Sequence, residues 1–306
     1  MSAARALSRW APDSSSCANA GTAAKLHRRM PGQSDFMKHL ILPAIALLFQ
    51  TFVPAAAAQE GRPYFVTYDH HLEERGELEA SLSMTSGLPK DGDPRYNAPW
   101  LELGYGVSDR WTTEFYLEGA AIRDDGSAFT GWRWENRFRP LKGDHRLNPI
   151  LYVEYESINE ASRIQKEIVG SGRLDFEPIS ELRAAHAHEL EAKPILSSTF
   201  GRWNVAENFT AEKNLSEDEG IEFGYSVGIS RSYKRFAAGV EAYGGMGSTL
   251  GFDAREQRHY LAPVLSWHIA PGTLKVSVAA GLTSASDHAL VRVSYSPASE
   301  PAGDAV

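Results

Sequence analysis

The chain has 306 residues, a formal net charge of −8, 42% hydrophobic residues and a mean hydropathy of −0.34. This acidity argues against nucleic acid as a partner, because binding a phosphate backbone requires a basic surface. The single cysteine, Cys17, lies near the N-terminus, so we expect neither a disulfide framework nor a cysteinyl metal or nucleophile site.

The first part of the chain has the features of processed sequence rather than of a domain. Residues 1–36 are rich in Ala, Ser and Arg without a sustained period, and we interpret them as an over-extended gene start or an unusual leader. Residues 37–58 combine a short polar start, an apolar run and three alanines before Gln59, which is typical of a secretory signal peptide. The run is about ten residues long and contains Pro43, so it is too short for a transmembrane helix.

Cleavage near Gln59 would leave a strongly acidic chain. Residues 1–58 contain six basic and two acidic side chains, so the remaining 248 residues carry a net charge of −12. That length is ample for one large β domain. Residues 59–75 fit either a periplasmic arm or a first strand, and 76–84 alternate apolar and polar residues as a strand does.

A β-hairpin over residues 100–119 is the pattern that the rest of the chain repeats. After a Gly/Pro/Asp-rich loop over 86–99, the sequence reads WLELGYGVSDRWTTEFYLEG. Successive strand side chains point to opposite faces, so Leu and aromatic residues share one face and Glu and Gly share the other. Ser108-Asp109-Arg110 forms the turn between the two arms.

The same period of two recurs to the end of the chain. Residues 158–192 are the exception, because their pattern fits an amphipathic helix, a loop or a strand, with 166–170 resembling a short strand. The other predicted strands cover residues 129–139, 148–157, 194–200, 204–215, 219–230, 236–244, 259–269, 273–282 and 288–295, with a Gly-rich loop over 244–256.

This count predicts an all-β fold, an antiparallel up-and-down transmembrane β-barrel of about twelve strands over residues 76–296, with ten to fourteen possible. Residues 297–306 form a polar tail. Aromatic residues near strand ends on the apolar face agree with interfacial girdles. The alternative is a secreted β-sandwich, which would less readily place charges and glycines on one face of nearly every strand.

The segments LELGYGVSDRW, ILYVEYE and EFGYSVGISR carry a resemblance to a known group. Over residues 76–295 the chain resembles bacterial outer-membrane β-barrels described as transporter-like, including the group named for a phenol-degradation pathway. The resemblance implies a cell outer-membrane location and a barrel fold, and it brings no substrate or catalytic residue with it. Tyr295 stands near the terminal aromatic that many such barrels use during assembly.

Charged side chains on the strands should face the lumen, because an Arg or Lys at the membrane midplane costs about 2–4 kcal/mol. Their mixed signs argue against strong ion selectivity. The predicted lumen-facing residues are Glu102, Glu114, Glu118, Arg133, Glu135, Arg137, Arg139, Glu154, Glu156, Glu222, Glu241, Lys275 and Arg292.

We therefore expect a narrow passive channel or transporter-like pore for small solutes. The alternatives are a plugged scaffold barrel that binds a partner through its loops and an outer-membrane hydrolase. Catalysis is not expected, since no nucleophile elbow, phosphate loop or His-x-Ser signature is present. The expected partners are outer-membrane lipid, the barrel assembly machinery and small solutes.

No cofactor or metal is expected. Imidazoles and carboxylates suit Zn or Cu, and the weak candidates for such a site are His70, His71, His186 and His188. A metal site requires three or four convergent ligands, and neither histidine pair has a diagnostic spacing.

Overall fold

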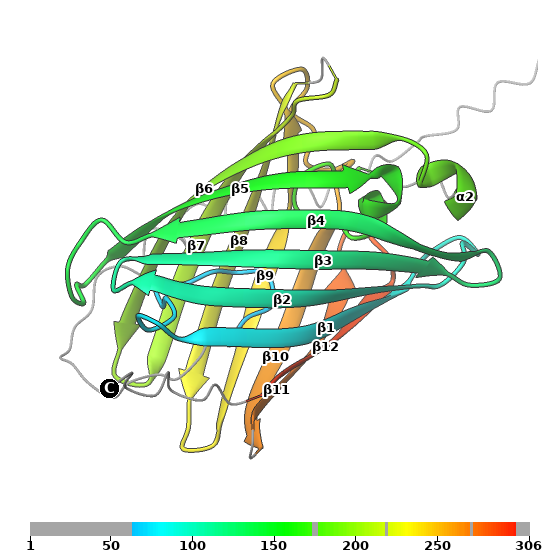
Figure 1. The fold of residues 1–306 in the computed structure, drawn as a ribbon. Helices are drawn as coiled ribbons and strands as arrows, with labels where there is room; N and C mark the ends of the chain where they lie inside the picture. Colours follow the sequence, from blue (N-terminus) through cyan, green and yellow to red (C-terminus); the bar gives the residue numbers. More distant parts are fainter. Residues whose placement is uncertain (1–62, 173–176, 218–219, 270–271, 298–306) are drawn as a thin grey trace, which may run out of the picture. The chain divides into compact units, whose positions relative to one another are not determined.

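A computed structural model describes residues 63–172, 177–217, 220–269 and 272–297, so the expected leader, signal peptide and most of the polar tail lie outside the described residues. The described part contains twelve strands and two short helical turns (Figure 1). The strands are β1 (Leu78–Leu88), β2 (Tyr96–Ser108), β3 (Trp111–Ile122), β4 (Gly126–Phe138), β5 (Asn148–Asn159), β6 (His186–Phe200), β7 (Trp203–Asn214), β8 (Ile221–Ser232), β9 (Phe236–Ser248), β10 (His259–Ile269), β11 (Gly272–Gly281) and β12 (Ala289–Pro297).

The strands form one closed antiparallel sheet. Each strand pairs with the next along the chain, and β12 pairs with β1 through partners such as Leu82 and Tyr295. Closure removes the free sheet edges that would otherwise expose unpaired backbone groups. The prediction of an all-β up-and-down barrel of about twelve strands is therefore confirmed.

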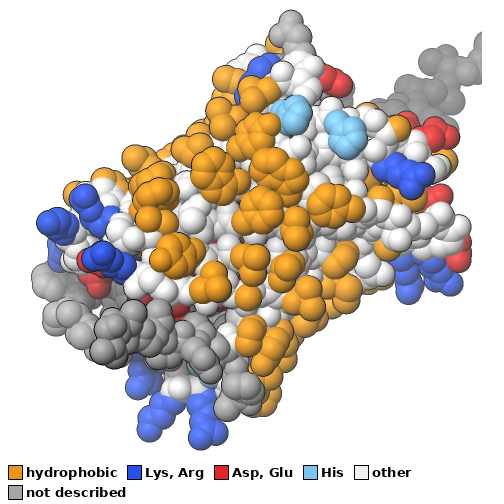
Figure 2. Space-filling view, in the orientation of Figure 1, with side chains coloured by type: hydrophobic (Ala, Val, Ile, Leu, Met, Phe, Trp, Pro, Cys, Tyr) orange, Lys and Arg blue, Asp and Glu red, His pale blue; other side chains and the backbone are white. Residues whose placement is uncertain are grey.

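The outer wall of the barrel is apolar. On β2 and β3 the outward residues include Leu101, Leu103, Phe115 and Leu117, all exposed, whereas the residues between them face inward. Figure 2 shows hydrophobic side chains covering the visible wall, with Lys and Arg near its ends. This distribution is the one that a strand with one lipid-facing side and one luminal side requires.

The expected hairpin over residues 100–119 is present as β2 and β3, joined at Asp109 and Arg110. The loop expected over residues 86–99 is shorter, because β1 continues to Leu88 and β2 begins at Tyr96. Proline at position 99 is tolerated within β2 although it cannot donate a ladder hydrogen bond.

Residues 158–192 do not form one continuous element. A 3-10 helix, η1 (Glu160–Ile164), is followed by irregular chain, and α2 (Ile179–Leu182) precedes the start of β6 at His186. The strand expected over residues 166–170 is absent, since this stretch is irregular. None of the helices within the described residues is long and apolar enough to cross a membrane.

Two segments outside the strands enter the barrel from opposite ends. Residues 63–75, which we call the luminal segment, contain no strand, so of the two alternatives predicted for residues 59–75 the first strand is absent from the described residues. Residues 160–172, which we call the infolded loop, connect β5 toward β6 and pack against β3 and β4. Figure 1 shows the start of β1 at one end of the barrel and α2 at the other.

The apolar wall leads to a test of membrane insertion. Leu103→Arg, near the middle of β2, should destabilise the folded barrel by about 2–4 kcal/mol, whereas Leu78→Arg at the start of β1 should cost about 0–1 kcal/mol. The measurement is reversible denaturant unfolding in lipid vesicles, with heat-modifiable gel mobility as the check for folding. Equal effects of the two variants would contradict a bilayer around the barrel.

Candidate functional site

The residues predicted to face the lumen lie along the strands at inward positions or next to the two inserted segments. Arg139 directly follows the end of β4 and contacts the luminal segment. Five of the thirteen are half-buried: Glu102, Arg133, Arg139, Glu222 and Lys275. The other eight are buried: Glu114, Glu118, Glu135, Arg137, Glu154, Glu156, Glu241 and Arg292.

Glu241 on β9 holds the start of the luminal segment through three consecutive backbone groups. Its carboxylate accepts hydrogen bonds from the N–H groups of Phe65, Val66 and Thr67, at 3.1, 3.0 and 2.9 Å. Backbone N–H groups that point at one anion form a charge-assisted site of the kind seen in anion-binding nests. The buried charge of Glu241 is thus satisfied by chain from a segment with no regular structure of its own.

Asn204 and Asn208 on β7 hold the next residues of the luminal segment. The side-chain amide of Asn208 accepts the N–H of Tyr68 at 2.7 Å and donates to its carbonyl at 2.8 Å. The Tyr64 hydroxyl donates to the Asn204 backbone carbonyl at 3.1 Å. These contacts satisfy the polar groups of an irregular backbone that would otherwise be orphaned inside the barrel.

Arg137 on β4 is the centre of the largest ion-pair cluster. Its side chain is fully buried; it pairs with Glu114, lies 2.9 Å from Glu135 and 3.0 Å from Glu73, and donates to the carbonyl of His71 at 2.9 Å. An isolated buried guanidinium would be very costly, so its pairing with several carboxylates and a carbonyl is required rather than incidental. Arg137 therefore ties the end of the luminal segment to the wall.

Two adjacent histidines differ in protonation because of their neighbours. His71 Nδ1 lies 2.9 Å from Asp69, and His70 Nδ1 lies 2.5 Å from the Ser197 hydroxyl. Burial alone would lower the pKa of His71, but the Asp69 carboxylate raises it above the ordinary value. Burial, reinforced by the charge of His71, lowers the pKa of His70 to about 4. Asp69 pairs with one histidine and Ser197 with the other, so no Asp-His-Ser chain of hydrogen bonds is formed.

The infolded loop is anchored differently, by apolar packing together with ion pairs. Ala161 and Ile164 are buried in a cluster with Tyr243 and Tyr260, and Ile168 packs against it. Farther along the loop, Lys166 and Glu167 make ion pairs that tie it to strands β6, β7 and β12, with Lys166 bound to Glu189 and Glu212, and Glu167 bound to Arg292. The infolded loop thus combines a small hydrophobic core with charge neutralisation.

Inward-facing glycines mark where the two inserted segments touch the wall. A Cβ added at Gly224 would lie 2.2 Å from the Ile168 side chain, and one at Gly228 would lie 2.6 Å from the Tyr64 ring. Glycine within a strand often marks a close approach of another part of the chain. The alternation of glycine with polar residues on β8 was a signal in the sequence, but on its own it fitted an open lumen equally well.

The histidines proposed as weak metal candidates do not converge. His70 and His71 lie in the luminal segment, whereas His186 and His188 are exposed on β6, where His188 Nδ1 lies 2.8 Å from the Tyr155 hydroxyl. Among the described residues, one group of side chains lies close enough to share a metal ion, and it consists of carboxylates, Glu156, Glu189 and Glu212.

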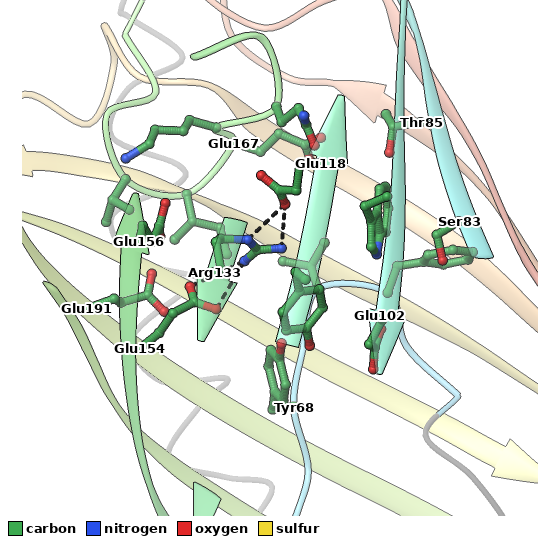
Figure 3. Close-up of a pocket in the computed structure, with 18 of the residues that line it drawn as sticks. Tyr68, Ser83, Thr85, Glu102, Glu118, Arg133, Glu154, Glu156, Glu167 and Glu191 are labelled. Atoms are coloured by element: carbon green, nitrogen blue, oxygen red, sulfur yellow. Dashed lines mark hydrogen bonds and ion pairs between the residues drawn. The ribbon is translucent and has the colours of Figure 1, made fainter. Parts of the chain in front are cut away.

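Between the two inserted segments lies a cavity of about 220 Å³. Its walls come from β1–β7, β11 and β12 together with both inserted segments. Figure 3 shows Arg133 held between Glu118 and Glu154, with Glu156 and Glu191 nearby and Tyr68 of the luminal segment below. Sequence reasoning identified the charged strand residues here but missed Tyr68 and Lys166, which the structure places outside the strands.

No family model and no curated protein matches the sequence. Among solved structures the chain is similar to KdgM porin, with a TM-score of 0.47 and 8% identity over 72% of this chain and 98% of that one. It is also similar to the translocator domain of the autotransporter NalP from Neisseria meningitidis (TM-score 0.42, 11% identity, 74% and 89% covered). LpxR from Salmonella typhimurium matches at a TM-score of 0.39 and 10% identity, with 71% and 99% covered. Because these TM-scores are below 0.5, the case for a function rests on this barrel's own residues.

Proposed function

We propose that the protein is an outer-membrane channel for small solutes whose lumen is closed at rest by the luminal segment. The observation that supports this most directly is the charged cavity enclosed between the luminal segment and the infolded loop. A barrel built only as a scaffold could fill its interior with close-packed side chains, as small barrels do. A charged cavity behind a separate segment is better suited to a gated path.

The membrane location rests on the apolar outer wall and on the expected export signal before Gln59. Both ends of the closed sheet, the start of β1 and the end of β12, lie at the end with the tight β2–β3 turn. Short turns and chain termini face the periplasm in barrels of this class. The luminal segment would then enter from the periplasm, and the infolded loop from outside. Membership of the transporter-like group remains a prediction.

The luminal segment is the part best suited to move. Its polar contacts are the hydrogen bonds to Glu241, Asn204 and Asn208 and the ion pairs of Arg137, and water can replace such contacts when the lumen hydrates. Its apolar contacts are divided among small clusters, in which Tyr64 and Leu72 pack against the wall. The infolded loop buries Ala161 and Ile164 in a larger apolar cluster, and exposing these side chains to water would cost free energy that no new contact with water offsets. We therefore assign the gate to the luminal segment and the fixed constriction to the infolded loop.

Glu241→Ala tests this gate. The variant loses the acceptor of three N–H groups, and charge-assisted hydrogen bonds contribute about 1.5–3 kcal/mol, so the open fraction should rise by about tenfold or more. The measurement is single-channel recording in planar bilayers, with heat-modifiable mobility to show that the barrel is folded. Glu207→Ala on β7, which removes a carboxylate from the outward face, is the matched control and should behave as the parent protein does.

A folded Glu241→Ala barrel that stays silent would overturn the gated channel and favour the plugged scaffold. A second variant, Gly228→Leu, acts without changing charge, because the new side chain would overlap the Tyr64 ring and displace the luminal segment. If both variants conduct no better than the parent, the proposed gate is wrong. The hydrolase alternative has no specific support from the arrangement of His70 and Ser197.

The histidines of the luminal segment make gating dependent on pH. His70 faces Ser197, Asp69, His71, Arg139 and Asp144. Its pKa is about 4 in the docked segment against about 6.5 for a free histidine, so an undocked segment binds more protons in this interval and docking weakens as pH falls from about 6.5 to 4.

His71 has the opposite effect, since its pKa is raised in the docked state. Protonated His71 stabilises the docked luminal segment fully below about pH 6.5, and this stabilisation is lost as the pH rises through the pKa of His71 in the docked state. Open probability should therefore increase on both the acid and the alkaline side of a minimum. His70→Gln should flatten the acid limb and His71→Gln the alkaline limb in bilayer recordings. A parent profile that is flat from pH 4 to 8 would contradict this assignment.

A further inference from the structure

The cavity between the luminal segment and the infolded loop carries more negative than positive side chains. Seven glutamates and five lysines or arginines line it. The cations come from the strands and from the infolded loop, and four of them already hold carboxylates, including Arg292, which pairs with Glu167. Arg133 lies 2.7 Å from Glu118 and 3.2 Å from Glu154, and Lys193 lies 2.8 Å from Glu191.

Lys166 is the fourth cation that is already engaged, because its ammonium pairs with both Glu189 and Glu212. Glu156 stands beside this pair, with a carboxylate oxygen within 4.8 Å of an oxygen of each. Three carboxylates thus share one ammonium. Like charges this close repel one another strongly in a site with little water.

Glu156 is the carboxylate of this group without a close contact of its own. It is 6% exposed, lines the cavity, and makes no hydrogen bond or ion pair within 4 Å with any residue that the structure describes, although it lies near enough to Lys166 and Arg133 to interact with their charges. A buried carboxylate that shares its nearest ammonium with two other carboxylates favours a further cation beside it. In Figure 3 it lies on β5 beside the open space between Arg133 and the loop.

Two hydroxyl groups on the same cavity are also unsatisfied. Thr67 Oγ1 in the luminal segment and Ser162 Oγ in the infolded loop are buried without a hydrogen-bond partner among the described residues. Both residues line the cavity. Native proteins rarely leave buried polar atoms unpaired unless water or a ligand serves them.

Tyrosine rings on the cavity wall already make cation–π contacts with positively charged side chains. The Arg133 guanidinium lies 4.4 Å from the centre of the Tyr116 ring, and the Lys193 ammonium lies 4.1 Å from that of Tyr152 and 4.7 Å from that of Tyr68. Tyrosine faces attract cations through the ring quadrupole, most of all in desolvated sites. Surplus carboxylates and tyrosines together favour an organic cation over an anion or a neutral sugar.

We propose that this cavity binds a small organic cation, with its ammonium group next to Glu156 and its polar substituents within reach of Thr67 and Ser162. The inference rests on the proposed channel, since it names the class of solute that the lumen would take. An anion placed there would lie beside Glu154, Glu156 and Glu212, in a cavity where four of the five lining cations already hold carboxylates.

The test measures binding of choline to the folded protein purified from membranes in detergent, by isothermal titration calorimetry at constant ionic strength. 3,3-Dimethylbutan-1-ol has the same shape without the charge and should not bind. Glu156→Gln should weaken choline binding by about tenfold or more, since a charge contact worth 1.4 kcal/mol corresponds to that factor. Glu160→Gln, which lies in the infolded loop outside the cavity lining, should leave the affinity unchanged.

Trp100 lines the cavity, so its fluorescence reports whether choline binds there. Choline should change the tryptophan fluorescence of the parent protein, and the change should disappear in Trp100→Phe while the calorimetric affinity remains. Saturable binding of galacturonate or phosphate with none of choline would overturn the proposal, as would equal binding of choline and its neutral analogue. Saturable binding of Ca²⁺ with none of choline would also overturn it and would point to the three carboxylates as an inorganic site.

Bilayer recordings separate a failure of this inference from a failure of the proposed channel. If Glu241→Ala conducts but the protein binds no choline and shows no cation preference in reversal potential, the channel stands and the organic-cation site is wrong. If choline binds and Glu156→Gln weakens it while no variant conducts, the site stands and the channel is wrong. Binding together with a cation-selective reversal potential supports both.

Discussion

The constraint on which this structure depends is that its strands have an apolar outer face and carry most of their charge on the inner face. With apolar residues such as Leu103 and Phe115 on the outer wall, most ionisable side chains of the strands are directed inward, and Glu207 on β7 is an exception. Closing twelve strands confines those charges to a limited volume in which each must find a partner or water. The fully buried Arg137, which contacts Glu73, Glu114 and Glu135, is the result of that confinement.

The same confinement explains why irregular chain can be held within the lumen. Backbone N–H and carbonyl groups need partners wherever they are buried, and a charged wall offers many. Glu241 accepts hydrogen bonds from three N–H groups, Asn208 pairs with both backbone groups of Tyr68, and Arg139 donates to the carbonyl of His70. The wall residues that cannot face lipid thus become the docking sites of the luminal segment.

The strands of the barrel wall could be predicted from the sequence, but the segments that fill the lumen could not. A period of two, repeated from the hairpin over 100–119 to the last strand, reports local backbone geometry and therefore needs no knowledge of distant residues. The luminal segment depends on partners about 140 residues away, as in the contact between Tyr64 and Asn204, and has no period of its own. Its place in the barrel was accordingly missed.

The infolded loop was unpredictable for a related reason. Residues 166–170 alternate as a short strand would. Lys166 nevertheless forms ion pairs with Glu189 and Glu212, and Glu167 forms one with Arg292. Ion pairs to three different strands outweigh the weak strand propensity of five residues. Gly224 and Gly245, which a sequence alone presents as small luminal side chains, are where the backbone of Ile168 comes close to the wall.

Glycine and charge divide the lumen into two sectors. Strands β8, β9 and β10 contribute none of the described residues that line the cavity, because the luminal segment rests on Gly228 of β8, Glu241 of β9 and Val264 of β10. The cavity instead follows the charged strands from β11 through β1 to β7. Any solute that enters the cavity while the luminal segment remains docked therefore lies in the charged sector, beside the carboxylate of Glu156. The residues that balance charge in the closed barrel are consequently the same residues that would select the solute.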